Sequence, residues 1–230
     1  MENLNANVVR VKGNYDESLR VCIKKASKNN WHIISDTSYE GYTEYPKYIM
    51  EGYTIMAKEI KKQLKNKPLP THVFLQGGVG SFPASICSYF WQEFKAKIMY
   101  IIVESELAPC LIKSSQNNKI TSFNIRKETI MAGLSCGEPS LLGWEILNQS
   151  ADHFMTIDDK SIPKTMRLLN NNIPKIEAGE SSVAGLAGLL DLMRKNNMAR
   201  KMGINNESTI LLFGTEGATD PEIYKSIIKA

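Results

Sequence analysis

A glycine-rich loop is the first candidate for chemistry in this chain. It follows a short apolar run at 73–75 and consists of Gly77, Gly78, Val79, Gly80 and Ser81. Glycines let backbone N–H groups approach an anion closely, and a following helix adds partial positive charge at its N-terminus. Pro83 suits the first turn of such a helix. The pattern predicts a phosphate-binding loop, although a tight turn between a strand and a helix explains the same glycines.

Two further loops carry polar side chains directly after strand-like runs. Asp36 follows the run 32–35, and its carboxylate is a candidate general base. Thr215 follows the run 210–213, and its hydroxyl is a candidate partner for a ring nitrogen. Each has a plainer interpretation, Asp36 as an Asx-turn or cap residue and Thr215 as a turn residue. The two loops alone do not decide between these alternatives.

The elements that position these loops alternate along the chain. Apolar residues recur every three or four positions through 48–64, which predicts an amphipathic helix, whereas 98–103 is nearly all apolar, as in a central parallel strand. We therefore predict an α/β fold, a mainly parallel twisted sheet flanked by helices, with ligands at the carboxyl ends of the strands. The predicted strands are 8–11, 32–35, 73–75, 98–103, 121–124, 153–156 and 210–213. The predicted helices are 15–27, 48–64, 84–94, 104–113, 162–170, 182–195 and 222–229, and 195–208 is expected to be a long polar connection.

Composition narrows the class of protein. The 230 residues carry 28 basic and 24 acidic side chains, a net charge of +4, without the dense basic patch that nucleic-acid binding requires. The four cysteines lie far apart with no CxxC pair, so we expect neither a metal site nor a disulfide framework, and a cytoplasmic location. No apolar run is long enough to cross a membrane, and the N-terminus lacks the apolar core of a signal peptide.

The segment 129–140, TIMAGLSCGEPS, followed by GWEIL at 143–147, resembles the diaminopropionate ammonia-lyases. These are pyridoxal-phosphate enzymes of fold type II, the tryptophan synthase β-like fold. Similarity continues in order through GNYDE at 13–17, SDT at 35–37, IMEGY at 49–53, the glycine loop, IVE at 102–104, GES at 179–181 and TEG at 215–217. Ordered matches over nearly the whole chain are far more specific than a single motif.

The resemblance implies a role for each loop. The loop 77–81 would hold the 5′-phosphate of pyridoxal 5′-phosphate, and Thr215 would face the pyridine nitrogen. Asp36 falls where the family has an aspartate that removes the Cα proton of the amino-acid substrate. Met131, Ala132 and Gly133 would line one side of the cofactor, although core packing explains the same apolar stretch. The implied reaction is α,β-elimination of 2,3-diaminopropionate to pyruvate and ammonia.

The family layout also implies that part of the enzyme lies elsewhere. Residues 1–40 would match the end of a small α/β domain and 41–230 the large cofactor-binding domain. The lysine that carries the cofactor in the family would lie upstream of this match. We therefore expect a truncated product or one half of a split enzyme, completed by an N-terminal polypeptide or acting as a homodimer.

Two other readings stay open. One is an inactive, degenerate lyase that binds a phosphate ligand or a partner protein. The other is an unrelated dinucleotide-binding domain, in which Glu104 would be the acidic residue after the second strand. The glycine spacing breaks the GxGxxG pattern of that domain, and Glu104 matches its acidic position only loosely.

Overall fold

The computed structural model describes residues 2–94 and 97–229. Its centre is a sheet of four parallel strands in the order β3-β2-β1-β4. The strands are β1 (His72–Gln76), β2 (Met99–Ser105), β3 (His153–Ile157) and β4 (Ile210–Leu212). In β1 every residue is buried, as expected of a parallel strand covered on both faces. The predicted α/β fold with a mainly parallel sheet is confirmed.

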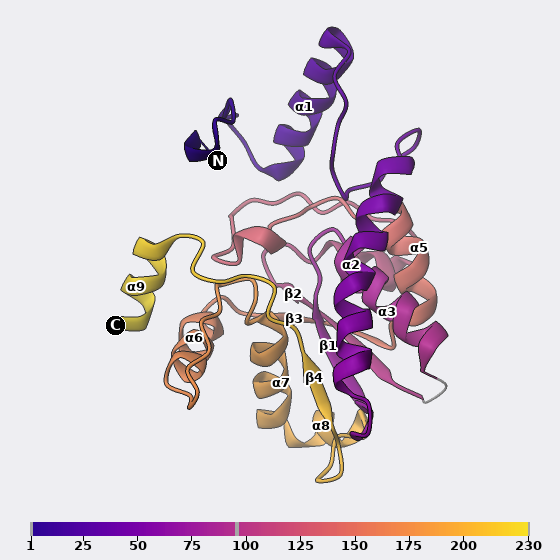
Figure 1. Cartoon of the computed structure of the whole chain (residues 1–230), viewed down its shortest axis with the longest axis vertical. Coiled ribbons are helices and arrows are strands. Elements are labelled where there is room, and N and C mark those ends of the chain that lie inside the picture. The colour runs from indigo at the N-terminus through magenta and orange to yellow at the C-terminus, as the bar shows by residue number, and fades with distance from the viewer. Residues whose placement is uncertain (1, 95–96, 230) are drawn as a thin grey trace.

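Helices cover both faces of the sheet (Figure 1). On one side lie α2 (Glu44–Gln63), α3 (Ser81–Glu93) and α5 (Leu141–Ser150). On the other lie α6 (Ser161–Asn170), α7 (Ala184–Arg194), α8 (Asn196–Lys201) and α9 (Pro221–Lys229). Because side chains alternate along a strand, Val73 and Leu75 of β1 pack against the first layer and Phe74 against the second. Each face of the sheet therefore has its own hydrophobic core.

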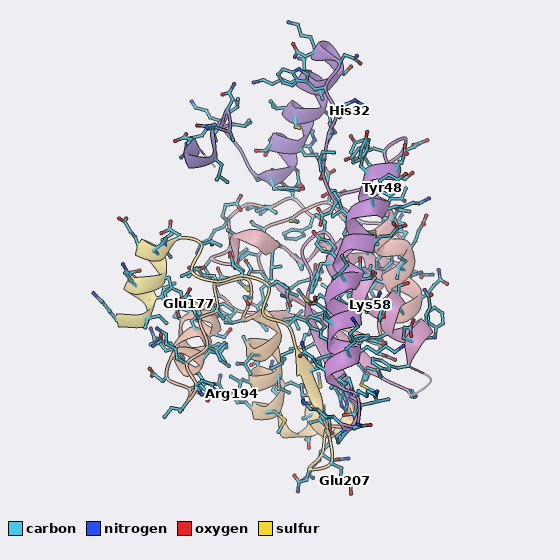
Figure 2. The ribbon with its side chains drawn as sticks, viewed as in Figure 1. His32, Tyr48, Lys58, Glu177, Arg194 and Glu207 are labelled. Atoms are coloured by element: carbon cyan, nitrogen blue, oxygen red, sulfur yellow. The ribbon has the colours of Figure 1, made fainter. Side chains whose placement is uncertain are left out.

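The N-terminal part of the chain is far less buried. Here α1 (Tyr15–Asn29) begins with a capping box between Asn14 and Glu17, and only Asp16 and Ala26 of this helix are buried. In Figure 1, α1 stands away from the layered body, and Figure 2 shows His32 in the segment that leads back to it. Short 3-10 helices lie at Glu2–Leu4 and Ala132–Leu134.

Three predicted strands are wrong, because none of the segments 8–11, 32–35 and 121–124 is a strand. In the second segment, the Tyr42 hydroxyl donates to the carbonyl of Ile33 at 2.9 Å and accepts from the N–H of Ser35 at 3.0 Å. A side chain thus takes the backbone bonds that a strand neighbour would make. At 121–124, Thr121 N–H bonds the Ser114 hydroxyl instead, at 2.9 Å.

Several predicted boundaries also change, including the start of α2, which is Glu44 and not 48. The segment 104–113 first completes β2, and α4 (Cys110–Asn117) begins only after Pro109, since the residue before a proline disfavours helix. Helix α3 begins three residues before the predicted start at 84, because Gly80 rather than Pro83 precedes the first turn. The polar connection 195–208 contains α8, whose Ala199 is buried in the core with the nearby Met202. Helix α5 was not among the predicted elements.

Along the described parts of the chain, we find no helix that is both long enough and apolar enough for a membrane span.

Candidate cofactor-binding site

The carboxyl ends of β1 and β4 open onto a cavity of about 590 Å³. The chain runs from β1 to β2 on one side of β1, while β4 lies on its other side, so the cavity is at a topological switch point. The predicted site residues that line it are Asp36, Gly77, Gly78, Val79, Ser81, Ala132, Gly133 and Thr215. Loops that are far apart in sequence therefore meet at one place.

The glycine loop forms the floor of this cavity. Gly77 N–H continues the ladder of β1 by donating to Val103 at 2.8 Å, and Gly80 has a φ of +98° directly before α3. Gly80 itself is not among the lining residues. Four residues of the floor have backbone N–H groups without an acceptor in the described chain, namely Gly78, Val79, Ser81 and Phe82. Unpaired N–H groups at a helix N-terminus are suited to a phosphate.

Two glycines of this loop would be strained by a side chain, Gly77 because of its neighbours and Gly78 mainly because of its backbone conformation. A Cβ on Gly77 would lie 2.7 Å from Glu104 Cγ. Gly78 has a φ of +61°, a left-handed conformation, and a Cβ there would lie 3.3 Å from the carbonyl oxygen of Gly133. The loop therefore requires glycine for both close approach and backbone conformation.

Asp36 lines a second side of the cavity and is held at both its side chain and its backbone. Its Oδ2 accepts a hydrogen bond of 3.0 Å from the Tyr53 hydroxyl, and its carbonyl accepts one of 2.6 Å from the Ser81 hydroxyl. Burial raises the pKa of the Asp36 carboxyl, and the bond from Tyr53 opposes that rise. The carboxylate is thus partly desolvated and tied to the glycine loop.

The loop of Asp36 is also anchored to the start of α5. Ser38 and Ser140 share a hydrogen bond of 2.7 Å between their hydroxyls, and Ser140 N–H donates to Val79 at 2.8 Å. Both serines are buried. These bonds join the segments 36–38, 77–81 and 140–142 into one unit.

Tyr15 and Cys136 line the same wall, and the sequence did not indicate them. The Tyr15 hydroxyl shares a hydrogen bond of 2.9 Å with the Thr37 hydroxyl. Burial raises the pKa of the Tyr15 phenol, and it raises that of the Cys136 thiol to about 12. Both groups are therefore neutral at physiological pH. Their signal was present only as part of longer matching motifs.

The third wall comes from the segment 129–134. Asp159 anchors it by accepting hydrogen bonds from the Thr129 hydroxyl at 2.5 Å and from Ile130 N–H at 2.9 Å. Gly133 N–H donates to the Ser181 hydroxyl at 3.0 Å. The Met131 side chain is fully buried in the core and does not line the cavity, whereas Leu134 does. The structure thus places Met131 beneath the wall.

Thr215 belongs to the fourth wall, after β4. Its hydroxyl accepts a hydrogen bond of 2.7 Å from Gln76 Nε2 at the end of β1. The other amide atom, Gln76 Oε1, is buried without a hydrogen-bond partner in the part of the chain described. Next to Thr215, Glu216 accepts from Ser181 N–H at 2.9 Å. Gln76 was not predicted as a site residue, because in the sequence it only ends an apolar run.

Glu104 is not free to bind a ligand. Its two carboxylate oxygens accept hydrogen bonds from Leu111 N–H at 2.8 Å and Ile112 N–H at 2.7 Å, at the start of α4. It is 1% exposed, and burial raises its pKa to about 8. The acidic residue that a dinucleotide-binding domain would need is therefore a buried helix-capping residue here.

Among the described residues, the cavity lacks a lysine and no cluster of metal ligands is found. No lysine is among those that line the cavity. No group of three or more His, Cys, Asp or Glu residues in 2–94 and 97–229 could hold a metal ion.

A glycine-lined anion niche, a half-buried carboxylate and a hydroxyl thus meet at the carboxyl edge of a parallel sheet, an arrangement suited to a phosphate-bearing cofactor. The family model of the pyridoxal-phosphate dependent enzymes matches residues 1–213, and this chain belongs to that family. The family's cofactor is pyridoxal 5′-phosphate, as predicted, and the unpaired N–H groups of the glycine loop fit its phosphate.

Comparison with individual proteins shows which members of the family this chain is similar to. The chain is 35% identical to the diaminopropionate ammonia-lyase of Escherichia coli over 98% of its own length and 59% of the relative's length. It is 36% identical to the Salmonella typhimurium enzyme of the same name, over 94% of this chain and 56% of that one. The chain thus spans somewhat more than half the length of these relatives.

A solved structure agrees with these matches. The Escherichia coli lyase in complex with an aminoacrylate-PLP azomethine reaction intermediate superposes with a TM-score of 0.92 and 34% identity. The match covers 99% of this chain and 60% of that one. The predicted resemblance to the diaminopropionate ammonia-lyases and to their fold is confirmed.

Proposed function

We propose that this chain forms the cofactor-binding part of a diaminopropionate ammonia-lyase, which converts 2,3-diaminopropionate to pyruvate and ammonia by α,β-elimination. The 35% identity to such a lyase over 98% of the chain carries this proposal. The meeting of the matching loops at one cavity supports it.

In this proposal each wall has a task. The loop 77–81 holds the 5′-phosphate through its unpaired N–H groups, with Gly80 setting the start of α3. Ala132 and Gly133 flank the ring, and Met131 supports them from the core. Thr215 presents its hydroxyl to the ring nitrogen.

When bound, pyridoxal 5′-phosphate supplies an electron sink for the charge left on the substrate's Cα. Asp36 takes the Cα proton on the carboxylate oxygen that Tyr53 does not occupy. Because burial raises the pKa of Asp36, its carboxylate binds a proton more strongly than an exposed aspartate, which suits a base that later returns the proton. The bond from Ser81 to the Asp36 carbonyl keeps base and phosphate loop in a fixed relation.

The lysine that carries the cofactor is proposed to come from outside this chain, because none of the lysines among the described residues lines the cavity. Residues 1–40 would then belong to a small domain, and 41–230 form the large one. A complementing N-terminal polypeptide or a second copy of the chain would complete the enzyme, in the cytoplasm.

The same observation favours a second candidate function. Without a lysine to carry the cofactor, the chain would be an inactive relative that binds a phosphate ligand or a partner protein.

One experiment separates these candidates. The purified chain is mixed with pyridoxal 5′-phosphate, treated with borohydride and mapped by mass spectrometry. Pyruvate formation from 2,3-diaminopropionate is then measured with and without the N-terminal part of the Escherichia coli lyase that this chain does not match. We expect reversible binding alone and pyruvate only after complementation, and Asp36→Asn should abolish pyruvate while Asp158→Asn, an exposed control, should not.

Binding without turnover in every mixture would favour the inactive relative. A lysine of this chain fixed by borohydride, with turnover by the chain alone, would refute the external lysine.

A further inference from the structure

Gln76 lies between the glycine loop, which forms the floor of the cavity, and the wall that contains Thr215. It ends β1 directly before the glycine loop, and it is 5% exposed. Its Nε2 lies 2.7 Å from Thr215 Oγ1 and 3.4 Å from the carbonyl oxygen of Phe213. A carbonyl oxygen can only accept, so the NH₂ end of the amide must face β4 and its loop. This fixes the amide orientation on chemical grounds.

The direction of the Thr215 hydroxyl follows from that orientation. Because Thr215 Oγ1 accepts from Gln76, its own hydrogen must point away from Gln76. Thr215 lines the cavity. We propose that Gln76 is a positioning residue, which turns Thr215 into a hydrogen-bond donor toward the neutral ring nitrogen of pyridoxal 5′-phosphate. The inference rests on the proposed function and names the residue that orients the hydrogen-bond donor to the ring nitrogen.

A second observation points to a polar ligand here. In the described chain, the buried side-chain atoms without a hydrogen-bond partner are Gln76 Oε1 and Ser182 Oγ. Both lie at the same turn, since Gln76 bonds the residues on either side of Gly214 and Ser182 Oγ lies 3.5 Å from where a Cβ on Gly214 would be. Buried polar atoms are nearly always paired in native proteins. Of these two residues, Gln76 lines the cavity and Ser182 does not, so Gln76 Oε1 is the free acceptor that a polar group in the cavity could pair.

The other hydroxyls of the cavity are less suited to this task. Those of Tyr53 and Ser81 already donate to Asp36. Tyr15 shares its hydrogen bond with Thr37. The Ser181 hydroxyl accepts from the backbone of Gly133, not from a side chain that a substitution can remove. Thr215 is thus the hydroxyl whose direction a single side chain controls.

Two ligands that differ at one atom test the proposal. The dissociation constants of the purified 230-residue chain are measured by calorimetry for pyridoxal 5′-phosphate and for its 1-deaza analogue, which has carbon in place of the ring nitrogen. One hydrogen bond predicts a preference of about tenfold for the nitrogen compound. Gln76→Glu should abolish this preference and Gln76→Met, which leaves the Thr215 hydroxyl free to rotate, should reduce it, while both variants still bind both ligands. In Gln76→Glu the carboxylate can only accept, so Thr215 would donate to it instead of to the ring.

The control is Gln63→Glu, the same change at an exposed position of α2, which should keep the wild-type preference. A purely structural role for Gln76 would weaken both ligands equally. An unchanged or larger preference in Gln76→Glu, or none in the wild type, would overturn the inference and leave phosphate binding intact. If the wild type bound neither ligand, the proposed function would fail as well.

A measurement on the wild type covers the case in which the Gln76 variants do not fold. The side-chain amide signal of Gln76 in a ¹H–¹⁵N spectrum should shift with pyridoxal 5′-phosphate and not with the deaza analogue. Equal shifts with both ligands would contradict the proposal.

Discussion

Two segments that line the cavity are supported very differently. The segment from β1 through α3 is buried along nearly its whole length, between two hydrophobic cores. The segment from α1 to Asp36 is mostly exposed, with Trp31 at 62% and Ile34 at 69%. The phosphate-binding wall is therefore stabilised by the chain's own core, whereas the wall that carries the proposed base depends on a few hydrogen bonds.

The largest expected effect comes from one substitution made in both segments. Ile86→Ala in α3 removes a fully buried side chain and should lower the free energy of unfolding by about 2–5 kcal/mol. Ile34→Ala should change it by less than about 0.5 kcal/mol, because the side chain is exposed. Urea unfolding of both variants measures the difference, and similar losses would show that the comparison is wrong.

The buried carboxyl of Glu104 should make the body of the protein sensitive to pH. Its pKa is raised by burial from 4.5 to about 8, so the protonated form is favoured by folding. Stability should then decrease as pH rises from about 4.5 to about 8. Glu104→Gln should remove this slope, while costing about 1–3 kcal/mol at low pH, because its NH₂ group cannot accept from α4. Unfolding curves across this pH range test it, and an unchanged slope would assign the effect to another group.

A pair of glycines separates binding from stability. Gly78 and Gly203 both have left-handed φ, +61° and +74°, so alanine at either should cost about 1–2 kcal/mol. Only Gly78 lines the cavity, and a Cβ on Gly203 would meet open space. Gly78→Ala should weaken binding of pyridoxal 5′-phosphate by roughly tenfold, about the loss of one hydrogen bond, and Gly203→Ala should not. Titrations of both variants would expose a wrong assignment through equal affinities.

The smallest expected effect concerns the more exposed wall. Tyr53→Phe removes the hydrogen-bond donor to Asp36 and should lower the free energy of unfolding by about 1 kcal/mol. The pKa of Asp36 should rise further, since the bond from Tyr53 lowers it. Tyr48→Phe is the matched control, because Tyr48 bonds Glu44 at an exposed site near the start of α2 (Figure 2). A ¹³C NMR titration of the Asp36 carboxyl reads the shift, and no change in Tyr53→Phe would remove Tyr53 from the site.

The sequence predicted the buried wall well because its signals are local. An apolar run, three glycines and a proline indicate strand, loop and helix within twenty residues, and that is how 72–93 folds. The strand predicted at 32–35 is wrong because the side chain of Tyr42, seven to nine residues further along, hydrogen-bonds the backbone of Ile33 and Ser35. Hydrophobic periodicity does not indicate such a contact between a side chain and the backbone.

The same limit applies to the site. Asp36 and Thr215 were found because each directly follows a strand-like run. Their partners Tyr53 and Gln76 were not found, because the contacts join residues that are far apart in sequence. Tyr53 lies 17 positions from Asp36, and Gln76 lies 139 positions from Thr215. Such pairs depend on how the sheet and helices come together, which the periodicity of a sequence does not encode.

The unequal pairing of the strands has a dynamic consequence. β1 pairs with β2 along all five of its residues, but β4 is an edge strand that pairs with β1 at only three residues, His72, Val73 and Phe74. Local opening needs the least free energy where the fewest bonds and contacts must break. We therefore expect the amides of β4 to exchange with deuterium before those of β1. When a ligand dissociates, we expect its contact with Thr215, directly beyond β4, to break before the contacts between its phosphate and the glycine loop.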